Sequence, residues 1–211
     1  MTGALAHAAC AALLLGLLPT FSGAAAPAAP PKSAASDLAA LPAATAPDAC
    51  RMHRGAFLSA RLRGASMLDV NWRGAALRCD GGARPDGRGM RVSFSGTDHA
   101  HRLLFIFGID AAPHVGSAHN VATNVTVIFE GERRLYSTRG DDRCTIDALS
   151  TRALPVQGNA HRLAVRARGF CISAASALGS GAPLLVSRFD FNGAIFLDAD
   201  APAGGAKQQP P

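Results

Sequence analysis

The strongest constraint on the fold is a period of two in the hydrophobic pattern. Apolar and polar side chains alternate strictly over residues 90–95, as they do on a strand that buries one face and exposes the other. Residues 103–107 are apolar on both parities, which predicts a neighbouring strand covered on both faces. The two runs are therefore expected to pair through a loop at residues 96–100.

Similar runs recur along the chain and predict most of the remaining strands. The dipeptide Asn192-Gly193 predicts a type I′ hairpin, because that turn needs positive φ at both central residues. Together the pattern predicts an all-β fold, a two-layer antiparallel β-sandwich of about eight strands, with at most a helical turn near residues 145–149 or 172–178. The further predicted strands are residues 57–63, 68–72, 77–79, 125–129 with 135–136, 162–168, and 189–191 with 195–197.

The first 25 residues have the pattern of a secretory signal peptide. Residues 8–18 form an apolar run too short to span a bilayer, and small residues suited to signal peptidase follow at 24–26. Residues 1–7 contain no Lys or Arg, which departs from the usual basic start. We expect a periplasmic or secreted mature chain that begins near Ala25 or Ala26 and has no transmembrane segment.

Export determines how the cysteines are interpreted, because thiols outside the cytosol oxidise and stay oxidised. Cys10 would leave with the signal peptide. Cys50, Cys79, Cys144 and Cys171 then form an even set without C-x-x-C spacing, which disfavours a zinc site or a redox pair. Four cysteines allow three connectivities; we favour Cys50 with Cys79 and Cys144 with Cys171, since each disulfide would staple neighbouring strands.

Composition sets the domain boundaries. Residues 26–49 are almost wholly Ala, Pro, Ser and Thr, and residues 201–211 are mostly Ala, Gly, Pro and Gln. Neither segment buries enough apolar area to offset its ordering entropy, so they are interpreted as a disordered tether and tail. Residues 50–200 remain for one β-sandwich domain.

The chain is basic, and its basic side chains are almost all arginines. The formal net charge is +6 and the pI is near 9.6. Arginine in place of lysine, together with abundant Ala and Gly, is typical of GC-rich coding, from which we infer a bacterial source. Codon bias and solubility are the favoured explanation of such a charge, and a polyanionic partner is the alternative.

One candidate site is a group of loop histidines with a nearby acid. Two histidines at i and i+2 project from the same face of an extended segment, and neutral imidazole is a common ligand of zinc and copper. A metal-dependent enzyme would also need an open coordination position and a base such as Asp98. Solvated surface histidines are the simpler interpretation. The candidate ligands are Asp98, His99, His101, His114 and His119.

The second candidate site is a stripe of arginines that alternate with core positions. Such a strand face would bind carboxylate or phosphate groups through bidentate hydrogen bonds from the guanidinium groups. A solvated face paired with local acids is the alternative. The stripe comprises Arg162, Arg166 and Arg168 on one strand and Arg61 and Arg63 on another.

These observations favour a non-catalytic binding or interaction module of the bacterial cell envelope over an enzyme. The expected partner is an anionic envelope polymer or an acidic protein. Nucleic acid is not expected, because an exported chain with one Trp and one Tyr offers few stacking platforms. The alternatives are a metal-dependent enzyme or metal-binding protein that uses zinc or copper at the loop histidines, and a structural accessory of a larger envelope assembly.

Overall fold

The computed structural model describes residues 48–51, 53–157, 160–179 and 181–197. The chain divides into two units, residues 1–43 and 44–211, and every described residue belongs to the second. The predicted signal peptide, the predicted tail and nearly all of the predicted tether lie outside the described residues and stay predictions. In the part of the chain that is described, no helix has the length and hydropathy needed to cross a lipid bilayer.

One antiparallel sheet of twelve strands makes up the described unit. Its order is β2-β1-β12-β10-β9-β7-β5-β4-β3, while β6 pairs with β9 and β8 pairs with both β7 and β11. A three-residue 3₁₀ segment, η1 (Gly74–Ala76), precedes β3. The strands are β1 (Phe57–Gly64), β2 (Leu68–Arg73), β3 (Leu77–Ala83), β4 (Met90–Asp98), β5 (His101–Ile109), β6 (Gly116–Ala118), β7 (Val121–Glu130), β8 (Arg134–Ser137), β9 (Cys144–Gln157), β10 (Ala160–Cys171), β11 (Ser176–Ala177) and β12 (Leu184–Leu197).

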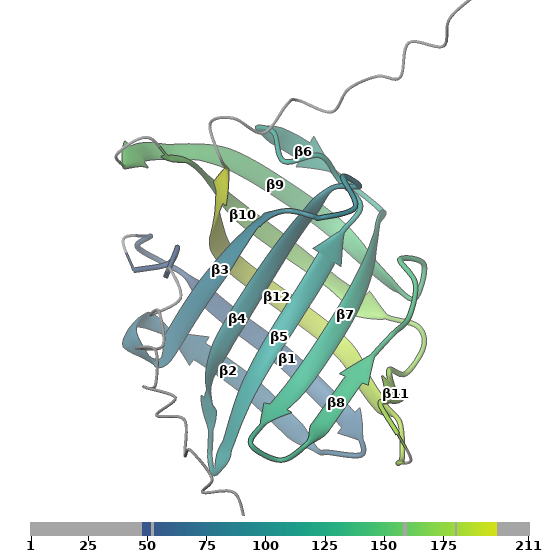
Figure 1. Cartoon of the computed structure of the whole chain (residues 1–211). Helices are drawn as coiled ribbons and strands as arrows, with labels where there is room; N and C mark the ends of the chain where they lie inside the picture. Colours follow the sequence, from purple (N-terminus) through teal and green to yellow (C-terminus); the bar gives the residue numbers. More distant parts are fainter. Residues whose placement is uncertain (1–47, 52, 158–159, 180, 198–211) are drawn as a thin grey trace, which may run out of the picture. The chain divides into compact units, whose positions relative to one another are not determined.

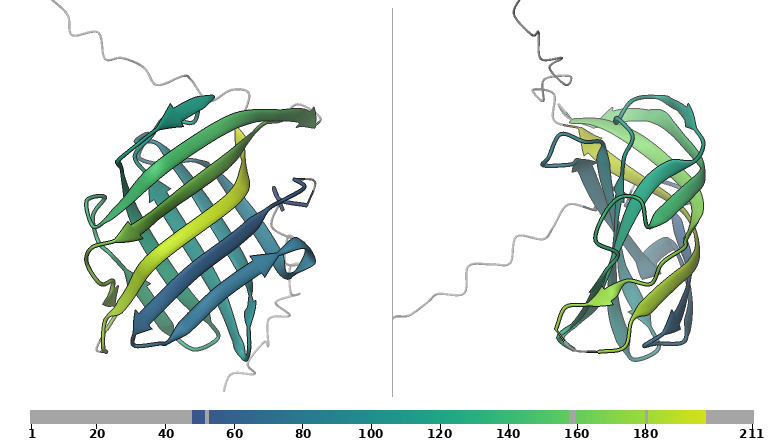
Figure 2. Two further views of the ribbon diagram at one scale, coloured as in Figure 1. Left: turned by 180° about the vertical axis from the view of Figure 1, so that it is seen from behind. Right: turned by 90° about the vertical axis from the view of Figure 1, so that its right-hand side faces the viewer.

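The sheet folds over on itself to give two layers. Figure 1 shows β3, β4, β5 and β7 in front, and Figure 2 shows β2, β1, β12 and β10 on the opposite side. The layers join where β7 pairs with β9, over only the residues Val121–Thr123 and Cys144–Ile146. The predicted two-layer antiparallel β-sandwich is confirmed.

The strand count of about eight was too low, and the predicted helical turns do not form. Residues 145–149 belong to β9, and Ser176 and Ala177 form β11. The strands that were not predicted are β6, β9 and β11. β6 and β11 have three and two residues, too few for a periodic pattern to be recognised, and part of β9 was interpreted as a helical turn.

Phenylalanine rings from both layers form the centre of the core. Phe107 of β5 lies 5.0 Å from Phe189 and 4.7 Å from Phe191, both of β12, between ring centroids. Phe94 of β4 lies 5.0 Å from Phe191. All four rings are fully buried, and such tilted aromatic pairs each contribute about 0.5–1.5 kcal/mol beyond the burial of their area.

The predicted hairpin at Asn192-Gly193 is wrong, because β12 runs straight through both residues. A Cβ on Gly193 would lie 2.7 Å from Cζ of Phe94, so glycine is required here for close packing between the layers rather than for a turn. Asn192 accepts a hydrogen bond from His53 Nε2 (3.1 Å) and donates one to the carbonyl of Gly55 (3.0 Å). Both residues therefore have packing roles inside one long strand.

Both predicted disulfides are present. Cys50 is joined to Cys79 of β3, with Cα atoms 5.2 Å apart, and Cys144 of β9 is joined to Cys171 of β10, with Cα atoms 3.8 Å apart. Cys144 and Cys171 are direct cross-strand partners, and all four residues are buried. Disulfides of this kind are typical of proteins that fold in an oxidising compartment.

Residues 48–50 lie over the seam where β3 approaches the end of β12. The amide of Ala49 donates to the carbonyl of Cys79 (2.7 Å), and Arg162 of β10 donates from Nη2 to the carbonyl of Ala49 (2.6 Å). Cys79 Sγ in turn lies 3.7 Å from the carbonyl oxygen of Ala194 in β12. The segment that precedes β1 thereby ties both layers together.

Replacing Cys144 and Cys171 together with Ala should lower the free energy of unfolding by about 3–4 kcal/mol. The crosslink closes a loop with a sequence separation of 27, and its removal restores the entropy of the unfolded chain. Urea unfolding of the wild type and the variant measures the difference.

Replacing Cys50 and Cys79 together with Ala should lower the free energy of unfolding by a similar amount, because their sequence separation is 29. Alkylation of the denatured, unreduced wild type provides the control. A label on any of these four cysteines would contradict the disulfide assignment.

Candidate functional site

Five exposed arginines gather on the outer surface of the layer formed by β2, β1, β12 and β10. Their inward-pointing neighbours, such as Val165, Ala167 and Phe189, are buried, and alternation along each strand turns the arginines outward. We call this surface the arginine face. It comprises Arg61 of β1, Arg73 of β2, Arg166 and Arg168 of β10, and Arg188 of β12.

Register places two of these arginines on either side of one aromatic ring. Arg73 lies opposite Phe57, Phe57 lies opposite Asn192, and Asn192 lies opposite Arg166. The guanidinium carbons of Arg73 and Arg166 lie 5.0 Å and 5.5 Å from the Phe57 ring centroid. This cation–π contact holds the two guanidinium groups in place while leaving their N–H groups available.

Most of the charge on the arginine face is not neutralised by the chain itself. Arg61 lies directly opposite Arg188, and like charges in that position destabilise a sheet. Arg61 has one exposed partner, Asp69, at 3.4 Å, and such exposed pairs contribute little. Within the described part of the chain, the other four arginines form no ion pair with a carboxylate.

The arginines surround a shallow hollow of about 700 Å³. Four of the arginines line it together with the polar residues Ser59, Asp69, Asn71 and Asp190 and the apolar residues Phe57, Ala60 and Val70. A second hollow of about 290 Å³ adjoins it over β10, β9 and β6, and Arg166 and Asp190 line both. Oδ1 of Asp190 is buried and accepts no hydrogen bond from the described residues.

The structure brings together three of the five arginines predicted from sequence, namely Arg61, Arg166 and Arg168. Arg63 lies on the same strand face, but its Nη1 donates to Asp69 and to the carbonyl of Leu62, both at 2.7 Å. The expectation that Arg162 faces solvent is wrong. Its residue is only 6% exposed, because the segment around Ala49 covers it.

Sequence reasoning missed Arg73, Arg188 and Asp190. The strand of residues 189–191 was recognised from its two phenylalanines. The alternating positions, Arg188, Asp190 and Asn192, could have been assigned to the outer surface by the same period of two. Arg73 follows the last buried residue of β2. Only the register of β1 between β2 and β12 shows that these residues share one surface.

Comparisons with protein-family models, curated proteins and solved structures find no match to this chain.

The predicted metal ligands are divided between opposite ends of β5. Asp98 and His101 pair across the β4–β5 hairpin, and His99 occupies its turn with φ of 51°, so His99 and His101 are not successive positions on one strand face. His114 and His119 follow the other end of β5, which is about 27 Å long. These five residues therefore do not share one site.

Two of the predicted histidine ligands, His101 and His119, are already hydrogen-bonded to other groups. His101 Nδ1 lies 2.6 Å from Oε1 of Glu132, and hydrogen bonds from His101 and then Arg134 lower the pKa of the Glu132 carboxyl. His119 donates from Nδ1 to the carbonyl oxygen of Asp147 (2.9 Å). Among the described residues, no group of three or more His, Cys, Asp or Glu side chains is placed to hold a metal ion.

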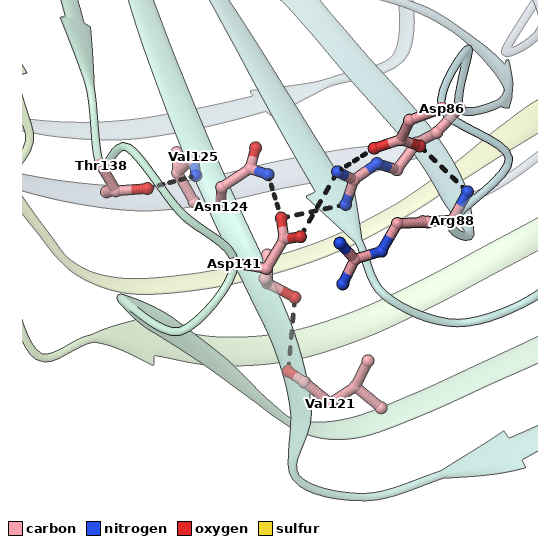
Figure 3. A network of polar contacts seen from close by, with 9 residues as sticks. Asp86, Arg88, Val121, Asn124, Val125, Thr138 and Asp141 are labelled. Carbon is pink, nitrogen blue, oxygen red and sulfur yellow. Dashed lines mark hydrogen bonds and ion pairs between the residues drawn. The ribbon is translucent and has the colours of Figure 1, made fainter.

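A second charged cluster joins two loops at one end of the sandwich (Figure 3). Arg84, after β3, pairs with Asp141 (3.0 Å) and with Asp86 (2.7 Å), and Asn124 of β7 also donates to Asp141. Hydrogen bonding from Arg84 holds the pKa of Asp141 below its ordinary value of 3.8. Because its charged groups are paired within the cluster, we interpret it as a structural clamp.

Asp141→Asn should lower the free energy of unfolding at pH 7 by about 1–3 kcal/mol, because Arg84 then loses its main partner. A depressed folded-state pKa stabilises the fold above the unfolded value and loses that effect as pH falls through the folded value. The difference from wild type should therefore shrink below about pH 3.8. Denaturant melts across pH 2.5–7 test this, and a difference that is constant with pH would contradict the assignment.

Proposed function

We propose that this protein is an exported, non-catalytic binding module of a bacterial cell envelope, and that it binds an anionic polymer on the arginine face. The observation that carries the proposal is the set of four exposed guanidinium groups without a carboxylate partner among the described residues. The close pairing of Arg61 with Arg188 adds to it. A surface that keeps like charges together against a stability cost is expected to have a ligand that neutralises them.

Arginine suits this role because of its geometry. Each guanidinium presents five N–H donors in a planar fork that matches the two oxygens of a carboxylate or a phosphate. Arg73 and Arg166 contact the Phe57 ring through cation–π interactions, which use none of the chain's hydrogen-bond acceptors. Prior positioning of this kind reduces the entropy lost on binding.

An extended hydrophilic polymer fits the arginine face better than an acidic protein does. Stable protein interfaces place aromatic and aliphatic side chains at their centre. Here the lining of the larger hollow is mostly polar, with Phe57, Ala60 and Val70 as its apolar members. The exposed Phe170 lies outside that hollow, beside Arg168 and Arg188. The hollows are shallow and open, which suits a chain that lies along the surface rather than a small molecule that must be enclosed.

The two disulfides support the expected location. They are typical of proteins that fold outside the cytosol, in agreement with the predicted signal peptide. Anionic polymers are abundant ligands in a bacterial envelope.

Replacing Arg166, Arg168 and Arg188 together with Gln should abolish retention on a carboxymethyl matrix at moderate salt. These side chains supply most of the unpaired charge on the arginine face, and their interaction with the matrix is screened by salt. The salt concentration at elution measures the effect. Thermal stability should change little, because exposed charges contribute little to folding.

A matched triple variant provides the control. Arg91, Arg102 and Arg133 are exposed and do not belong to the arginine face, so their joint replacement with Gln removes the same net charge. This control should elute close to wild type. Equal loss of retention in both triple variants would mean that net charge alone drives binding and would overturn the proposal.

A further inference from the structure

We propose that the anionic ligand is an acidic polysaccharide whose chain lies across the strands, from β2 over β1, β12, β10 and β9 to β6. This inference rests on the proposed function and adds to it the chemical class of the ligand and its direction on the sheet. Three features support it: a continuous row of residues, the groups along that row, and the carboxylate of Asp190.

The row is defined by strand register. Arg73, Phe57, Asn192 and Arg166 are successive cross-strand partners, Arg166 then pairs with Ser150, and Ser150 pairs with Ser117. Five steps of about 4.8 Å between neighbouring strands give a length of about 24 Å. The two hollows adjoin at Arg166 and Asp190, so the row runs along both, and we call the adjoining pair the depression. A single small anion would occupy only a fraction of it.

Charged and neutral polar groups are mixed along this depression. Guanidinium groups come from β2, β1, β12 and β10, and hydroxyl or amide groups that make no hydrogen bond to another described residue stand between or beyond them. Chains of sugar acids present carboxylates and hydroxyls in the same mixture. The neutral groups are Ser59, Asn71, Ser117 and Ser150.

Asp190 distinguishes a sugar from a purely ionic polymer. It lies in the middle of the depression, opposite Ser59 on one side and Arg168 on the other, and it forms no ion pair with a described arginine. A carboxylate repels phosphate and carboxylate groups alike, but it also accepts hydrogen bonds from hydroxyls, which only the sugar polymer provides. Inorganic polyphosphate offers no hydroxyl donors along its chain, whereas a polymer of sugar acids offers several on each unit.

Calorimetric titration with oligogalacturonates of increasing length tests the proposal. Affinity should rise with length until the oligomer spans about 24 Å and should then level off. Inorganic polyphosphate of matched charge should bind more weakly than the longest oligogalacturonate. Asp190→Asn should narrow that preference by raising the affinity for polyphosphate.

Acidic substitutions close to the two ends of the row test its direction; Asn71 lies two residues before Arg73 on β2, and Ser150 is the cross-strand partner of Ser117. Asn71→Glu on β2 and Ser150→Glu on β9 should each weaken binding of long oligomers by about tenfold or more through repulsion, and should leave binding of the shortest oligomers unchanged. Thr97→Glu, an exposed position on β4, is the matched control and should change neither. Melting temperatures verify that all three variants fold.

The outcomes separate this inference from the proposed function. Equal affinity at every length, or end variants that behave like the control, would overturn the cross-strand path while anion binding stands. Tighter binding of polyphosphate than of oligogalacturonate would overturn the sugar class. Absence of binding to all of these probes, together with absence of retention on the carboxymethyl matrix, would overturn both.

Discussion

Contact between the phenylalanine rings of the two layers fixes the position of everything outside them. Phe107 packs against Phe189 and Phe191 across the sandwich, and the alternation of β12 then leaves Arg188 and Asp190 on the outer surface. A slip of one residue in this strand would expose both rings and bury a guanidinium and a carboxylate. Burial of such charges without partners is strongly unfavourable, so the aromatic core also determines which side chains form the arginine face.

The remainder of the chain shows that its unpaired arginines are not a consequence of composition. Arg84 is paired with two aspartates, and Arg134 donates from Nε to Glu132 at 3.0 Å while lying over the ring of Phe129. Arg162, although buried, has the carbonyl of Ala49 as an acceptor. On the arginine face, by contrast, four of the five guanidinium groups form no ion pair with a carboxylate of the described residues. Natural sequences break local rules of this kind mainly at sites with a function.

The sequence predicts features that depend on near neighbours and misses those that depend on distant ones. The period of two identified the sandwich and the outward position of Arg166 and Arg168, and the even set of cysteines identified both disulfides. The predicted turn at Asn192-Gly193 failed because the ring of Phe94, far away in the sequence, packs against Gly193. The prediction that Arg162 faces solvent failed for the same reason, since residues near Ala49 cover a position that alternation alone would expose. The metal hypothesis assumed that loops on either side of one strand converge, and a strand of nine residues holds them apart.

The position of β12 has a consequence for the order of folding. This strand is the last of the described strands, yet it lies between β1 and β10, and Phe57 pairs with Asn192. Pairing over so large a sequence separation is slow, and the layer that carries the arginines cannot assemble until the final strand is available. The two disulfides have sequence separations of only 29 and 27 residues. One crosslinks the part of the chain around β1, the other joins β9 to β10, and neither contains a residue of β12. Oxidation can therefore crosslink both of these parts before β12 is in place. Insertion of β12 between β1 and β10 then completes the fold.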